Sequence, residues 1–144
     1  MTLKSPTPKI LRTLFQGELA AIESYGAAIH SFPELAAHPL IEGIRADHGR
    51  AVETLRNLII AHGGTPPMDW ELWDGVEAVD GSPEPCYQPS PALASFKEGE
   101  KKTVSRYELA LEDGSLPESA KGIIRDKLLP SAWKNWLYVE TLIV

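Results

Sequence analysis

The chain contains little cysteine and no excess of positive charge. Cys86 is its only cysteine, which excludes an internal disulfide and a metal site built from several thiolates. The 144 residues include 14 Lys and Arg against 20 Asp and Glu, for a formal net charge of -6. Nucleic acids and anionic lipids are bound through clustered basic side chains. The composition therefore argues against both as main partners.

Long apolar runs and familiar catalytic motifs are also missing. No stretch approaches membrane-spanning length, and the opening "MTLKSPTPKILRTLF" has no apolar segment of signal-peptide length. No glycine-rich phosphate loop and no nucleic-acid motif occurs. The length suits one domain with a real hydrophobic core. We expect a cytoplasmic protein with a single domain, 1–144, and no membrane partner.

Helical periodicity is the strongest pattern that is present. Apolar residues recur at steps of three and four in four segments, whereas the alternation typical of strands is weak. The four stripes are Leu11, Leu14, Glu18, Ile22, Tyr25 and Ile29; Ile41, Ile44, His48, Ala51, Leu55, Leu58 and Ile59; Leu93, Phe96, Glu100, Val104, Tyr107 and Leu111; and Ile124, Leu128, Ser131, Asn135, Tyr138 and Leu142. Pro130 should kink the fourth helix. The pattern predicts an all-α fold.

A connection rich in proline and glycine divides the chain into two helical hairpins. Residues 64–90 break the periodicity and have room for one short helix. They separate a hairpin at 8–63, closed by Gly63 and Gly64, from a hairpin at 91–143. "SLPE" at 115–118 has the spacing of a capping box, which predicts the start of the last helix.

The two hairpins repeat each other. A Gly-Glu pair followed by Tyr seven residues after the Glu occurs once in each half, and so does the tetrad "VETL". The alignment pairs Glu18 with Glu100, Tyr25 with Tyr107, and His48 with Asn135. Each hairpin alone would leave an apolar stripe in water, and facing the two stripes buries both. The repeat therefore predicts a four-helix bundle with a long crossover connection.

The stripes place two carboxylates in the interior of this bundle. An ionised carboxylate in an apolar interior costs several kcal/mol unless it is paired or coordinated. A metal ion, a buried cation or a proton retained on one carboxyl group could each compensate. Arg45 could be the cation, because a guanidinium group can hold one carboxylate or bridge two. We expect a polar core network that surrounds the two glutamates and consists of Tyr25, Arg45, Tyr107 and Asn135.

Five segments, taken in order, cover nearly the whole chain and resemble a known family. They are "GELAAIESY", "ADHGRAVETLRNLIIAHGGTPP", "LWDGVEAVDG", "KEGEKKTVSRYELALED" and "SLPESAKGIIRDKLLP". Together they resemble the ferritin-like superfamily and, within it, the DUF2383 group of four-helix-bundle proteins of unknown function, which are similar to rubrerythrin. The resemblance implies a ferritin-like bundle made of two tandem helical hairpins.

The resemblance also implies a metal centre that has lost ligands. Di-iron bundles use one Glu from each of two helices and a Glu-x-x-His from each of the other two. Three of these places are taken by Glu18, His48 and Glu100. The remaining places hold Arg45, Ala132 and Asn135, so the di-iron site is degenerate. The three matching residues could still hold a single Fe or Zn, with water completing the shell.

The leading functional hypothesis is a non-catalytic structural, binding or stress-associated protein with no cofactor. The alternative is a metal-binding protein, or an oxidase or peroxidase of rubrerythrin type, that uses Glu18, His48 and Glu100. A third hypothesis is a small-ligand carrier with a pocket below the Pro130 kink. The apolar ending "ETLIV" suggests docking against this chain or a second copy, and Trp133 and Trp136 could pack the Pro130 kink or form part of a partner surface. We expect a homodimer.

Overall fold

The structure is a computed structural model that describes residues 9–31, 39–66 and 89–141. Within these ranges it is built from helices and has no strand, which confirms the all-α prediction. The helices are α1 (Lys9–Ser31), α3 (Pro39–Ala61), α5 (Pro89–Leu111), α6 (Glu118–Ile123), the π-helix η1 (Ile124–Leu128) and α7 (Leu129–Thr141). The short helix expected in the connection and the side chains of Leu93 and Leu142 lie outside the described part.

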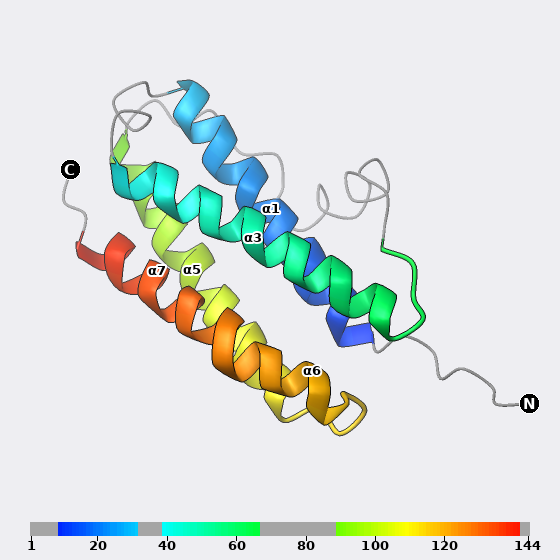
Figure 1. The fold of residues 1–144 in the computed structure, drawn as a ribbon. Coiled ribbons are helices and arrows are strands. Elements are labelled where there is room, and N and C mark those ends of the chain that lie inside the picture. Colours follow the sequence, from blue (N-terminus) through cyan, green and yellow to red (C-terminus); the bar gives the residue numbers. More distant parts are fainter. Residues whose placement is uncertain (1–8, 32–38, 67–88, 142–144) are drawn as a thin grey trace, which may run out of the picture.

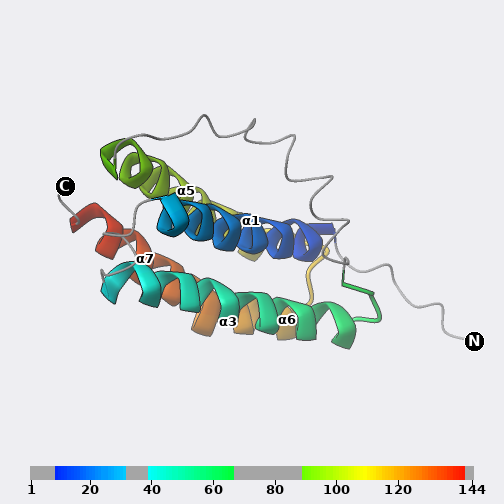
Figure 2. The same ribbon diagram turned by 90° about the horizontal axis from the view of Figure 1, so that it is seen from above.

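Two antiparallel helix pairs lie side by side (Figures 1 and 2). α1 packs along α3, and α5 packs along the continuous helix formed by α6, η1 and α7. α1 and α5 also run in opposite directions. The last residues of α3 and the first residues of α5 lie at opposite ends of the bundle. None of the described helices is long and apolar enough to cross a membrane.

The core is apolar at both ends and polar in the middle. One apolar cluster contains Phe15 and Leu55, and a smaller one contains Phe96 and Val139. Each of α1, α3, α5 and α7 carries a buried polar residue that stands, in the chain, between members of the two clusters. These residues are Glu18, His48, Glu100 and Asn135. The stripes predicted for the first two helices are confirmed, because all their members are buried or half-buried.

The fourth helix departs from the predicted stripe after Leu128. The Leu129 N–H donates to the Ile124 carbonyl, which makes a π turn. This wider turn falls where the Pro130 ring would crowd the carbonyl four residues earlier, and it takes in one extra residue. The buried face after Pro130 is consequently Ala132, Asn135 and Val139. The prediction was wrong for Tyr138, which is 39% exposed, whereas Ser131 is half-buried.

The sequence predicted one helix end correctly and one helix start incorrectly. α3 ends at Ala61 and is closed, as predicted, by Gly63 and Gly64: Gly63 has φ 82°, and the Gly64 N–H donates to the Ile59 carbonyl over 2.9 Å. The capping box at 115–118 is wrong, because the N-cap of α6 is Pro117 and makes no side-chain cap bond. Ser115 instead donates from its N–H and its hydroxyl to Asp113. The following helix therefore begins without the reciprocal bonds that a capping box supplies.

Candidate functional site

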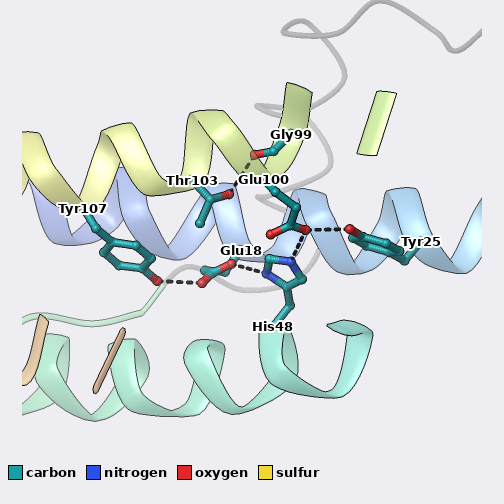
Figure 3. Close-up of polar contacts among 7 residues, drawn as sticks. All are labelled: Glu18, Tyr25, His48, Gly99, Glu100, Thr103 and Tyr107. Atoms are coloured by element: carbon teal, nitrogen blue, oxygen red, sulfur yellow. Dashed lines mark hydrogen bonds and ion pairs between the residues drawn. The ribbon is translucent and has the colours of Figure 1, made fainter. Parts of the chain in front are cut away.

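The buried polar layer is the candidate site, and it draws on three helices (Figure 3). Glu18 comes from α1, His48 from α3 and Glu100 from α5, and their exposed fractions are 4%, 2% and 1%. Each lies on the inward stripe of its helix, which is the reason the sequence buries it. At this depth water cannot solvate a charge, so the side chains have to satisfy one another.

His48 lies between the two glutamates and binds both. Its Nδ1 is 2.5 Å from Glu18 Oε1, and its Nε2 is 2.8 Å from Glu100 Oε2. A carboxylate only accepts hydrogen bonds, so each ring nitrogen has to carry a proton. An imidazole ring with two N–H groups is an imidazolium cation. The geometry therefore makes His48 the buried positive charge that faces two negative ones.

The pKa of His48 is raised from its ordinary value of 6.5 to about 10. Burial by itself would lower this pKa, because it disfavours the charged form. The hydrogen bonds to Glu100 and Glu18, together with the charges of the two carboxylates, outweigh that effect. His48 is therefore protonated throughout the physiological pH range.

Two tyrosines complete the cluster by bonding across the repeat. The Tyr107 hydroxyl donates to Glu18 Oε2 and the Tyr25 hydroxyl donates to Glu100 Oε2, each over 2.6 Å. Because α1 and α5 are antiparallel, the Tyr two turns beyond each Glu meets the Glu of the other half (Figure 3). Burial, with the carboxylate charges added, raises the pKa of both tyrosines, so both hydroxyls remain donors.

Among the residues that the structure describes, two buried side-chain oxygen atoms have no hydrogen-bond partner. They are Glu100 Oε1 and Asn135 Oδ1. Asn135 is buried on α7 as predicted, but no hydrogen bond joins it to the Tyr25–Glu100–His48–Glu18–Tyr107 cluster. Both ring nitrogens of His48 are therefore bonded within the cluster, whereas Glu100 Oε1 accepts no hydrogen bond from the described residues.

Arg45 does not lie where we expected it. Within the described residues it makes no ion pair with either glutamate, and its side chain is half-buried beside Gly26. A Cβ atom on Gly26 would stand 3.2 Å from an Arg45 guanidinium nitrogen. His48 lies one helical turn further on and occupies the place between the carboxylates. This corrects the expectation that Arg45 supplies the central positive charge.

The residues present do not fit a metal centre in this arrangement. Metal ligation requires lone pairs that converge on one point, whereas both nitrogens of His48 direct protons at carboxylates. Among residues 9–31, 39–66 and 89–141, no group of three or more His, Cys, Asp or Glu side chains is placed to hold a metal ion.

A small pocket reaches Glu18 from the side of α5. Its volume is about 10 Å³, room for about one water molecule, and its lining includes Glu18, Tyr107, Thr103 and Arg106. Gly17 leaves room for the Arg106 side chain, since a Cβ atom there would come within 2.8 Å of the guanidinium group. The sequence pattern did not indicate Arg106 or Thr103 as part of a site. The signal that could have indicated this close approach is Gly17, a glycine inside a helix directly before the buried Glu18.

This pocket lies between α1 and α5, so it differs from the small-ligand pocket expected below the Pro130 kink.

Comparison of the chain with protein-family models, with curated proteins and with solved structures found no match.

We predict that stability falls with rising pH above 6.5. Between pH 6.5 and about 10 the folded chain keeps the His48 proton that the unfolded chain releases. The full stabilisation is therefore present below pH 6.5 and is lost as the pH rises through about 10. One retained proton corresponds to a slope of about 1.4 kcal/mol per pH unit. Urea unfolding at a series of pH values measures this slope. A flat profile in the native chain would contradict the assignment, and His48→Gln should flatten it.

We predict that the two tyrosine hydroxyls contribute unequally. Tyr107→Phe leaves Glu18 Oε2 without a donor, whereas after Tyr25→Phe the Glu100 Oε2 atom still accepts from His48. The expected losses in the free energy of unfolding are about 2 kcal/mol for Tyr107→Phe and about 1 kcal/mol for Tyr25→Phe. Tyr138→Phe, on an exposed ring, is the matched control and should be near neutral. Equal losses for the two buried positions would refute the bonding pattern.

Proposed function

We propose that this chain is a ferritin-like bundle in which a cluster made only of side chains has replaced the di-metal centre, and that its role is structural or binding rather than catalytic. The observation that carries the proposal is the position of His48, which donates from both ring nitrogens to Glu18 and Glu100. The imidazolium group performs the charge compensation for which a metal ion would otherwise be needed.

The arrangement of the helices supports the ferritin-like part of the proposal. Two antiparallel hairpins lie side by side, and the same pair of residue types, Glu and Tyr, projects inward from the first helix of each hairpin. Ferritin-like bundles place their carboxylate ligands at the corresponding inward positions. In this chain Glu18 and Glu100 stand at such positions, and hydrogen bonds from protein groups occupy three of their four oxygens.

The residues at the remaining ligand places support the loss of a two-metal centre. Ala132 is buried and has no donor atom, and the Asn135 amide is a neutral group. Arg45 brings a positive charge next to the layer, which opposes the binding of a cation. Three of the six protein ligands of a di-iron site are thus absent, and the one histidine ligand that remains, His48, is already protonated at both nitrogens.

A mononuclear metal protein is the second candidate function. Glu100 Oε1 favours it, because this buried oxygen has no partner and is available as an acceptor. Fe or Zn would then be held by Glu18, His48 and Glu100, and His48 would have to release at least one proton to become a ligand. The two candidates consequently differ in what they predict about bound metal.

We predict that the protein purified without chelator contains no stoichiometric Fe or Zn, and that a chelator leaves its thermal unfolding midpoint unchanged. The reason is that the negative charges of Glu18 and Glu100 already have their counter-ion in His48. Elemental analysis of the purified chain and unfolding with and without chelator are the measurements.

Glu100→Gln is the mild variant for the same experiment, since it keeps the side-chain shape. The proposal expects this variant to be metal-free like the native chain, with a loss of stability that added Zn does not restore. One metal ion per native chain that disappears in both Glu100→Gln and His48→Ala would overturn the proposal and establish the second candidate.

A further inference from the structure

Exposed large hydrophobic side chains gather on α7. Five large hydrophobic side chains are exposed among the described residues, and three of them lie within six positions of α7. They are Trp133, Leu137 and Tyr138, with exposed fractions of 38%, 58% and 39%. Isolated exposed apolar residues need no explanation, but a contiguous group rimmed by charges is typical of an interaction surface.

The charges on this face are arranged symmetrically about Leu137. Lys134 precedes Leu137 by three residues and Glu140 follows it by three, so both lie beside it on the helix surface. Trp133 and Thr141 stand four residues before and after it in the same way. All five side chains are exposed. Lys134 and Glu140 therefore stand at equal distances on either side of Leu137 with opposite charges, while the outer places hold Trp133 on one side and Thr141 on the other.

Contacts within the chain hold the two charges in place. Lys134 Nζ lies 3.2 Å from Asp47 Oδ2 of α3, and about half of the lysine side chain remains exposed. Trp136 Nε1 donates to Glu140 Oε1 over 3.2 Å, and the Trp133 and Trp136 rings lie with centroids 4.9 Å apart. A lysine ammonium group has three protons, so Lys134 can keep Asp47 and still bind another carboxylate.

We propose that this face packs against the same face of a second copy of the chain, with the two α7 helices antiparallel and Leu137 on the two-fold axis. In that arrangement Lys134 of each copy meets Glu140 of the other, which gives two equivalent ion pairs on either side of the Leu137 contact. A two-fold interface has to be self-complementary, and this reversal of charge about one apolar residue supplies that property. Packing also removes Trp133 and Leu137 from water.

Charge exchange tests the interface directly. Lys134→Glu places two carboxylates opposite each other in a homodimer, and Glu140→Lys places two ammonium groups opposite each other. Sedimentation equilibrium should therefore show a dimer for the native chain and dissociation constants that are about tenfold higher, or more, for each single variant.

Recombination of the two variants is the decisive part of this experiment. In a mixed dimer of Lys134→Glu with Glu140→Lys, one contact keeps the native ion pair and the other has the same pair with its charges exchanged. An equimolar mixture should therefore restore the native dissociation constant. The double variant Lys134→Glu/Glu140→Lys should do the same on its own, because both of its contacts have exchanged charges.

Two further variants separate this interface from indirect effects. Asp47→Asn removes the ion pair within the chain but leaves both intermolecular pairs intact, so the dissociation constant should not change. Leu137→Ser removes the central apolar contact and should abolish the dimer, while circular dichroism shows that the helices remain. A native chain that stays monomeric, single variants that dimerise as the native chain does, or a mixture that fails to recover would each overturn the proposal.

Discussion

The structure depends on one imidazolium group held between two carboxylates. Glu18 and Glu100 come from different halves of the chain and would repel each other across an apolar interior. His48 donates to both, and by doing so it joins α1, α3 and α5 at one point in the centre of the bundle. Loss of one member of such a buried set leaves an uncompensated charge, which typically costs about 3–5 kcal/mol. The cluster therefore fixes how the three helices align along the bundle.

The two halves share their glutamates and tyrosines but differ at the residue that compensates them. One imidazolium can bind both carboxylates because it has a donor on each side of the ring, so the second half needs no cation of its own. Asn135, at the place equivalent to His48 in the repeat, and Glu100 each have a side-chain oxygen without a partner among the described residues. Each half of the repeat thus supplies one glutamate and one tyrosine that donates to the other half's glutamate, but only the first half supplies a cation, His48.

The sequence was sufficient to predict the helices and the side chains that line their interior, because helical periodicity depends only on local spacing. It located the polar layer for the same reason: Glu18, His48 and Glu100 interrupt stripes that are otherwise apolar or aromatic. It offered Arg45 as the possible buried cation and His48 only as a possible metal ligand, so it did not identify His48 as the central cation. Both lie near the same face one turn apart, and only the packing of α1 against α3 decides which of them reaches the carboxylates.

The remaining errors come from interactions that spacing does not reveal. The π turn before Pro130 adds a residue and moves the buried face from Tyr138 to Val139. Ser115 has the spacing of a cap but bonds to Asp113 in the preceding turn.

The most direct test of the central cluster is a nitrogen-15 NMR spectrum of the His48 ring at about pH 8, where an ordinary histidine is neutral. The account predicts that Nδ1 and Nε2 both carry a proton. A spectrum in which one ring nitrogen of His48 has no proton would contradict it.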